Sequence, residues 1–294
     1  IAADFEQWWP DIPVAKVKSG NRITDLGGNP VLIGTTALVF QLGKQSEWEA
    51  DLVIADEQHK QSTKIRESLL RTHSNLLEAT ATPIPRSAAL ITYGSMSIST
   101  LRECPVQKTI HTRVATNADR DAVFQQIREI VMGGKQVAII YPRVSDEEKT
   151  KSSVEQAAAG WEKILPGRVG MLHGRMSDEE KETVITRMKA REFDVLISST
   201  VLEVGVSLPD LSGVLVINPD RYGVAQLHQM RGRVARKGGV GHFIMLCQGA
   251  IGPETQERLD LLVNISDGYL LAEKDAELRG FGDLHFIAVR SNIM

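Results

Sequence analysis

The 294-residue sequence has few of the features that mark secreted, membrane-embedded or strongly basic proteins. It contains two cysteines, Cys104 and Cys247, which are far apart and form no CxxC pair, so we expect two buried thiols in a reducing compartment rather than a disulfide. No apolar run approaches the length that spans a bilayer. These absences indicate a cytoplasmic protein that has no membrane partner.

Excess positive charge is also missing. The formal net charge is -3, so nucleic-acid binding would have to depend on local clusters of basic residues. Nothing before Gly20 resembles a signal peptide, and the first residue is Ile1. We therefore expect the chain to be an internal segment of a longer protein.

What the sequence does contain is an alternation of short Val-, Ile- and Leu-rich runs with segments of helical period, which is typical of parallel strands covered by helices. The fold class is therefore α/β. The length suits two lobes and a tail. In the first part we expect strands at residues 14–17, 31–33, 52–55 and 76–79, and a helix at 61–71.

A second α/β series begins at Ala118. Val123, Ile127 and Val131 lie on one helical face with Ile130, and a glycine pair follows. Ser177 and Glu180 form a capping box before a further helix. Strands are expected at residues 136–141, 193–198, 214–217 and 243–247, and a join at 100–117. The predicted domains are residues 1–112, 113–249 and 250–294, with a cleft between the first two.

Acidic and hydroxyl side chains follow the apolar runs of the first part. Asp56 and Glu57 end one strand, where a nucleotide motor needs one carboxylate for magnesium and one for the attacking water. Thr80 and Thr82 end the next strand before two prolines and could sense the nucleotide. The alternatives are a charged turn and an ordinary polar loop.

The second part carries basic and hydroxyl residues at comparable places. In residues 226–236, QLHQMRGRVAR, helical spacing sets Gln229, Arg233 and Arg236 on one face, where guanidinium groups could meet a transferring phosphoryl group. The alternative is a solvated face or a patch on DNA phosphates. Hydroxyls end the strand before Thr200, and Gly205 would let backbone approach a ligand. His173 and Arg175 could contact a phosphate backbone, although a lone histidine is more often structural.

Taken in order, six stretches resemble the motifs of superfamily-two helicases as they occur in RecG. They are IGTTAL at residues 33–38, DEQH at 56–59, TATPIPR at 80–86, HGRM at 173–176, STVLEVGV at 199–206 and QLHQMRGRVAR at 226–236. The resemblance covers about residues 5–283. Its last part, residues 266–283, is similar to the translocation motif that RecG shares with the transcription-repair coupling factor.

This resemblance implies two RecA-like parallel-sheet lobes in tandem with a short helical C-terminal translocation tail. It implies a monomeric, ATP-driven motor on forked or branched duplex DNA, with ATP and Mg²⁺ as cofactors. By matching position, Asp56 would hold magnesium, Glu57 would activate water, and Arg233 and Arg236 would be arginine fingers. The residues implied to bind or sense nucleotide are Gln58, His59, Gly205 and Gln229. Those implied to contact DNA or couple to it are Gly34, Thr35, Thr80, Thr82, His173, Arg175, Thr200 and Arg279.

The sequence departs from this family in three places. No GxxxxGK[ST] phosphate-binding loop occurs, so we expect that loop to lie upstream and these residues alone not to turn over ATP. Ser207 stands where RecG usually has aspartate, and Thr36 where histidine is usual. After Asp283 the family's usual ending is replaced, and the wedge domain is absent. The alternative function is a helicase-like protein that binds nucleic acid or a partner without turnover; an RNA helicase is disfavoured by the tail.

Overall fold

The structure is a computed structural model, and its described residues form two compact units. The described residues are 2–17, 31–35, 38, 41, 50–56, 74–79, 97, 99–101, 103, 106–142, 147–199, 208 and 210–279. The units are Ile1–Ala81 and Thr82–Met294. Within these described ranges, no helix has both the length and the apolar character needed to cross a membrane.

In its described residues, the first unit contains two pairs of parallel strands. Its elements are α1 (Ala2–Trp8), β1 (Val14–Val17), β2 (Val31–Gly34), β3 (Leu52–Asp56) and β4 (Asn75–Ala79). Strand β1 pairs with β2, and β3 pairs with β4. All four strands were predicted to within one residue at either end, because each is a short apolar run bounded by polar or turn residues.

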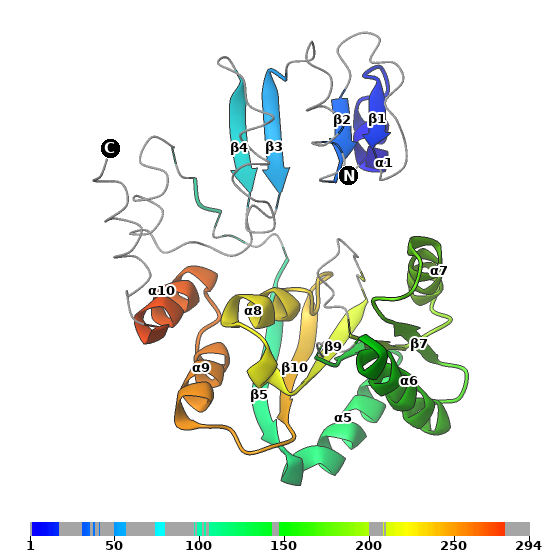
Figure 1. Cartoon of the computed structure of the whole chain (residues 1–294), viewed down its shortest axis with the longest axis vertical. Coiled ribbons are helices and arrows are strands. Elements are labelled where there is room, and N and C mark those ends of the chain that lie inside the picture. The colour runs from blue at the N-terminus through cyan, green and yellow to red at the C-terminus, as the bar shows by residue number, and fades with distance from the viewer. Residues whose placement is uncertain are drawn as a thin grey trace. The chain divides into compact units, whose positions relative to one another are not determined.

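The second unit is built on one six-stranded parallel sheet, in the order β5-β10-β9-β6-β8-β7. Its strands are β5 (Lys108–Thr116), β6 (Gln136–Ile140), β7 (Val169–Leu172), β8 (Val195–Ser198), β9 (Leu211–Ile217) and β10 (Gly239–Cys247). Its helices are η2 (Asn117–Asp119), α5 (Arg120–Met132), α6 (Glu147–Ile164), α7 (Asp178–Lys189), η3 (Pro219–Arg221), α8 (Val224–Gly232), α9 (Pro253–Asn264) and α10 (Gly268–Arg279) (Figure 1). This arrangement confirms the α/β class.

Helices cover both faces of this sheet, which is why its central strands are continuous apolar runs. All five residues of β6 are buried. Val137 and Ile139 belong to one core cluster, with residues of α5 and α6, whereas Ala138 and Ile140 belong to the other, with residues of α8 and α9. The alternation follows from the period of two along a strand.

Two local predictions in the second unit are confirmed at atomic detail. The hydroxyl of Ser177 accepts from the Glu180 N–H at 3.1 Å, and the Glu180 carboxylate accepts from the Ser177 N–H at 2.7 Å. Together they make the expected capping box at the start of α7. Helix α5 buries Val123, Ile127 and Val131, as the sequence period indicated.

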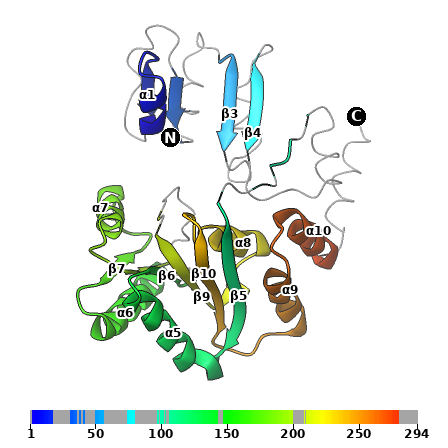
Figure 2. The ribbon, with the colours of Figure 1, turned by 180° about the vertical axis from the view of Figure 1, so that it is seen from behind.

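The join predicted at residues 100–117 is wrong in part, because residues 108–116 form strand β5. This strand lies at one edge of the sheet beside β10 (Figure 2), pairing with it in register from Lys108 to Thr116. Its sequence, KTIHTRVAT, mixes polar and apolar residues, since an edge strand is only half covered. The predicted domain boundary at residue 112 falls inside this strand. The three-part division otherwise stays a prediction.

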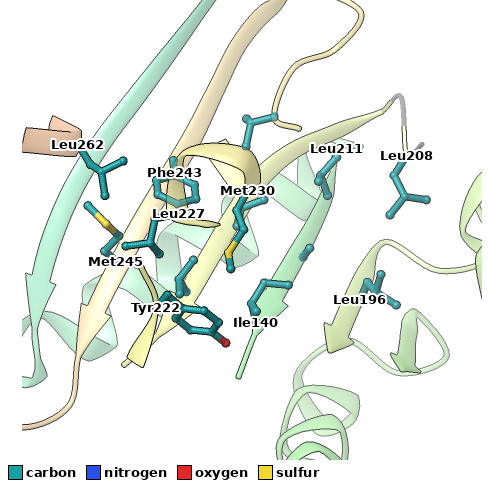
Figure 3. Packing of buried hydrophobic residues seen from close by; sticks show 14 of the residues in the cluster. Ile140, Leu196, Leu208, Leu211, Tyr222, Leu227, Met230, Phe243, Met245 and Leu262 are labelled. Atoms are coloured by element: carbon teal, nitrogen blue, oxygen red, sulfur yellow. The ribbon is translucent and has the colours of Figure 1, made fainter. Parts of the chain in front are cut away.

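Helices α8, α9 and α10 contact one another on one side of the sheet, and α9 also contacts β5 (Figure 1). Figure 3 shows side chains of this cluster, with Leu227 and Met230 from α8, Phe243 and Met245 from β10, and Leu262 from α9. Leu227, Met230, Phe243, Met245 and Leu262 have no exposed surface. Burying each such side chain contributes roughly 1.5–3 kcal/mol. The tail helices are therefore part of the core of this unit.

Candidate functional site

Asp56 ends strand β3 directly beside the end of β4. Its Cα is paired in register with Ala79, the last residue of β4. Asp56 is exposed, so its carboxylate is available to solvent. Ala79 immediately precedes the predicted hydroxyl turn. Two of the predicted motifs therefore begin at neighbouring carboxyl ends of a parallel strand pair, which is where open α/β sheets bind ligands.

Gly34 ends β2 in a place where only glycine fits. A Cβ added there would lie 2.8 Å from the Val17 carbonyl oxygen and 2.9 Å from the Leu38 Cβ. Its neighbour Thr35 is exposed, and the Thr35 carbonyl accepts from the Leu38 N–H at 2.9 Å. The glycine is thus explained by close approach of backbone within the first unit, and the Gly-Thr pair lies at a solvent-facing strand end.

Polar side chains follow three neighbouring strands of the second unit at their carboxyl ends. The Tyr141 N–H after β6 donates to the Ser198 carbonyl of β8, and the Ser199 N–H donates to the Leu172 carbonyl of β7. Burial raises the pKa of the Tyr141 phenol, with a smaller opposing effect from Arg120, so this group stays a hydrogen-bond donor.

Two buried polar atoms at this edge have no hydrogen-bond partner in the described part of the chain. They are Nδ1 of His173 and Oγ of Ser199, in residues whose exposed fractions are 8% and 1%. Buried polar atoms are normally paired, so unpaired ones indicate a place where a ligand can contribute. Arg175, two residues after His173, is exposed. Of the two predicted phosphate contacts His173 and Arg175, therefore, only Arg175 is exposed to solvent.

Helix α8 ends earlier than the sequence pattern suggested. It spans Val224–Gly232, and Arg233 is its C-cap. Ala235 has a left-handed backbone, φ 52°, and its N–H donates to the Leu211 carbonyl at 2.8 Å. The prediction that Gln229, Arg233 and Arg236 share one helical face is therefore wrong for Arg236. The helix ends before this residue, and the backbone of the following turn bonds to strand β9 instead. Arg233 is half-buried at the helix end, and Arg236 is exposed in the turn beyond.

A third arginine in the same stretch, Arg231, is buried. Its Nη1 donates to the carbonyls of Leu262 at 2.5 Å and Ile265 at 2.8 Å, and its Nη2 donates to the Ser266 carbonyl at 3.4 Å. Its Nη2 also lies 2.8 Å from Nδ1 of His228. Burial lowers the pKa of this guanidinium.

Sequence reasoning missed Arg231, although the sequence held a signal for it. Val224, Leu227 or His228, and Arg231 follow one another at spacings of three and four residues, so they line one side of a helix. Two of these positions are apolar, which indicates that the stripe is buried. A buried arginine on such a stripe must find acceptors nearby.

Several predicted site residues lie outside the described residues. They are Glu57, Gln58, His59, Thr80, Thr82, Thr200 and Gly205, together with the departures Thr36 and Ser207. Arg279 is the last residue of α10, and Gln229 is half-buried within α8. Cys247 is buried, as expected, whereas Cys104 is also outside the described residues.

Comparison with known proteins identifies the family. Residues 120–238 match the helicase conserved C-terminal domain. The ATP-dependent DNA helicase RecG of Thermotoga maritima is 38% identical over 274 residues, covering 91% of this chain and 34% of the relative. The chain belongs to the RecG type of helicase. RecG of Synechocystis is 36% identical over 263 residues, covering 87% of this chain and 31% of the relative.

The structural comparison agrees with this assignment. A solved structure of RecG bound to a three-way DNA junction matches with a TM-score of 0.67 and 30% identity, covering 93% of this chain and 37% of that one. The predicted RecA-like helicase fold is thereby confirmed. The chain spans about a third of the length of the curated RecG relatives it matches.

Proposed function

We propose that this chain is the motor core of an ATP-dependent DNA helicase and translocase that acts on forked or branched DNA in repair and recombination. The observation that carries the proposal is the identity of 38% with a RecG helicase across 91% of the chain. The solved RecG structure adds that this relative binds a three-way DNA junction.

The nucleotide chemistry is assigned to four residues, Asp56, Glu57, Arg233 and Arg236. Asp56 supplies an exposed carboxylate at a strand end, and carboxylate oxygen is a ligand that Mg²⁺ prefers, so the residue fits a metal-holding role. Bound magnesium would neutralise phosphate charge. Glu57 would orient and deprotonate the attacking water. Arg233 and Arg236 would donate to the transferring phosphoryl group, because a guanidinium is always charged and forks towards oxygens.

The DNA contacts are assigned to strand ends. Exposed Thr35 beside Gly34, and exposed Arg175, can donate to phosphate oxygens without reading base sequence. The unpaired Oγ of Ser199 adds a donor next to Thr200. Such contacts are local, which agrees with a net charge of -3.

The remaining matched residues are assigned to sensing nucleotide and transmitting its state. For nucleotide sensing we assign Gln58, His59, Gly205 and Gln229. For coupling to DNA we assign Thr80, Thr82, His173 and Arg279. Movement of the tail helices α9 and α10 would then follow the nucleotide cycle.

Fork unwinding by the protein expressed from its complete reading frame tests this function. We expect ATP- and Mg²⁺-dependent strand displacement on a forked duplex, and none in a Glu57→Gln variant that still binds DNA. Displacement that persists without ATP, or that is equal in the variant, would refute the helicase assignment.

A second function, binding without turnover, is favoured by one observation. No GxxxxGK[ST] pattern occurs in the 294 residues, and a P-loop motor needs that backbone cradle and lysine. Sequencing the reading frame upstream of Ile1 separates the two functions. A GxxxxGK[ST] there supports the motor, and a start codon close to Ile1 supports the binding protein.

A further inference from the structure

Arg236 lies in a turn whose backbone needs support from outside the turn. The turn follows helix α8, and Ala235 in it has a left-handed backbone with φ 52°. A residue with a Cβ seldom adopts that conformation unless surrounding groups impose it. The Gly238 N–H closes the turn by donating to the Ala235 carbonyl at 2.9 Å. The place of Arg236 therefore depends on the contacts of this turn with the rest of the second unit.

The first of these contacts is made by the backbone. The Ala235 N–H donates to the carbonyl of Leu211, the first residue of β9, at 2.8 Å. The same segment packs closely on β10, because a Cβ added to Gly241 would clash with the Val234 side chain and lie 3.3 Å from Cβ of Ala235. Only glycine permits this approach. The residue before Arg236 is thus fixed against two strands.

The second contact is an ion pair on the other side of Arg236. Nζ of Lys237 donates to Oδ1 of Asp210 at 2.8 Å, and Asp210 directly precedes Leu211. The other carboxylate oxygen, Oδ2, lies 3.7 Å from Nε of Arg191. The pKa of Asp210 is lowered, first by the hydrogen bond from Lys237 and against an opposing effect of burial, so the carboxylate is charged at neutral pH. Two consecutive residues at the start of β9 therefore hold the residues on either side of Arg236.

This arrangement matters for chemistry more than for stability. Lys237 and Asp210 have side-chain exposed fractions of 63% and 30%, and an ion pair so open to solvent adds little to stability. A guanidinium that stabilises a transferring phosphoryl group must be held in place before the reaction, and a misplacement of about 1 Å can cost roughly 10²-fold in rate. The pair can therefore be important for turnover while it contributes little to folding.

We propose that Asp210 and Lys237 are positioning residues, whose ion pair fixes the turn that carries Arg236 so that its guanidinium meets the transferring phosphoryl group. This inference rests on the proposed function, in which Arg236 is an arginine finger. Neither Asp210 nor Lys237 contacts the nucleotide in this scheme. Loss of the pair should therefore slow turnover and leave ATP binding unchanged.

The test uses variants of the protein expressed from its complete reading frame. Lys237→Ala removes the cation, and Lys237→Arg replaces it with one that can still pair with the Asp210 carboxylate. Asp210→Asn weakens the same contact from the β9 side, because a neutral acceptor binds an ammonium less strongly than a carboxylate does. The matched control is Lys163→Ala, which removes an exposed lysine from α6 in the same unit.

The readout is the DNA-stimulated rate of ATP hydrolysis at a series of ATP concentrations, measured by phosphate release, together with thermal unfolding. We expect kcat to fall by about tenfold or more in Lys237→Ala, while the KM for ATP and the Tm stay close to wild type. Asp210→Asn should lower kcat in the same way, whereas Lys237→Arg and Lys163→Ala should match wild type. A role limited to stability would lower the Tm and leave the kcat of the folded protein unchanged.

A double-variant cycle with Arg236→Ala shows whether the ion pair acts through Arg236. Once the Arg236 guanidinium is gone, the pair has nothing left to position, so adding Lys237→Ala should cause no further loss of kcat. If Lys237 itself contacted the nucleotide, the losses of the two single variants would multiply in the double variant.

The inference is overturned if kcat in Lys237→Ala stays near wild type, if Lys237→Arg is as slow as Lys237→Ala, or if the two losses multiply in the cycle. Should Lys237→Ala lose its cooperative thermal transition, Asp210→Asn decides by the same criteria. If the unaltered protein does not hydrolyse ATP, the proposed function itself is wrong. An active wild type that is slowed by Arg236→Ala, but not by the ion-pair variants, rejects only the positioning role.

Discussion

Nη2 of Arg231 lies 2.8 Å from Nδ1 of His228. A guanidinium can only donate, so Nδ1 must be the acceptor and the imidazole must be neutral, with its proton on Nε2. The lowered pKa of this ring agrees with a neutral imidazole. Burial, then the charges of Arg231 and Lys108, lower the pKa of His228 from 6.5 to about 4, against a smaller opposing effect of Asp267.

We predict that His228 titrates far below an ordinary histidine. In the unfolded chain its pKa is 6.5, so between pH 6.5 and about 4 the unfolded state binds more protons than the folded state. Stability due to this group is therefore lost as the pH falls through that window. The loss amounts to about 2 kcal/mol by about pH 5. An NMR titration of the histidine ring protons measures the pKa directly.

The control for this prediction is His228→Gln, whose amide oxygen can still accept from Arg231. Urea unfolding at about pH 7 and about pH 5 should show a smaller loss of stability in the variant than in wild type. A His228 resonance that titrates near 6.5, or an equal pH dependence in both proteins, would contradict the neutral, buried ring.

Gln136 gives a second stability prediction. It is buried at the start of β6, and its Nε2 donates to the carbonyls of Met188 at 2.6 Å and Phe193 at 2.8 Å. Gln136→Leu has a similar volume but leaves both carbonyls without this donor, so we expect a loss of about 1–3 kcal/mol in the free energy of unfolding. Urea denaturation measures it.

The control for Gln136 is Gln125→Leu on α5, an exposed residue whose amide donates to the Glu129 carboxylate. A surface change of this kind should alter stability by no more than about 0.5 kcal/mol. If Gln136→Leu lowered the free energy of unfolding as little as Gln125→Leu, the two carbonyls would not need the Gln136 amide as a hydrogen-bond donor.

Most of the regular structure could be predicted because the signals are local. Strands β1 to β4 are apolar runs between turn residues, and the Ser177–Glu180 capping box is contained in four residues. Strand β5 was missed because its partner, β10, lies more than a hundred residues away, and its own sequence alternates polar with apolar residues. Long-range pairing decides such an edge strand.

The local geometry around the predicted site residues could not be predicted from the sequence. The helical pattern of residues 226–236 continues through Arg236, yet the Ala235 N–H bonds to Leu211 in β9 and ends the helix. The guanidinium of Arg231 donates hydrogen bonds to the carbonyls of Leu262, Ile265 and Ser266, about thirty residues later in the chain. The two partners of each of these contacts are too far apart in the sequence for a local pattern to include both.

The two arginines after α8 carry a prediction about chemistry. In the protein expressed from its complete reading frame, Arg233→Ala and Arg236→Ala should each lower ATP turnover by about 10³-fold or more, because each removes a cation that is proposed to contact the transferring phosphoryl group. Binding of a fluorescent ATP analogue should persist. An arginine whose loss leaves turnover near wild type would have to be reassigned to a solvated surface or a DNA contact.

The 294 residues by themselves should not turn over ATP. They contain no GxxxxGK[ST], so the β- and γ-phosphates lack the backbone cradle and lysine of a P-loop motor. Steady-state phosphate release with forked DNA, compared with a Glu57→Gln variant of the same 294 residues, measures this. Turnover clearly above that variant would show that the phosphates are held by other groups in this chain.

The central claim, that this chain is the core of a RecG-type ATP-driven DNA motor, is tested most directly by DNA-stimulated ATP hydrolysis. The measurement is the phosphate-release rate of the protein from its complete reading frame, with and without a forked duplex, beside an Asp56→Asn variant. We predict strong stimulation by the fork in the wild type and none in the variant, which lacks the carboxylate proposed to hold magnesium. A hydrolysis rate that does not change when the forked duplex is added, or that is equal in Asp56→Asn, would contradict the account.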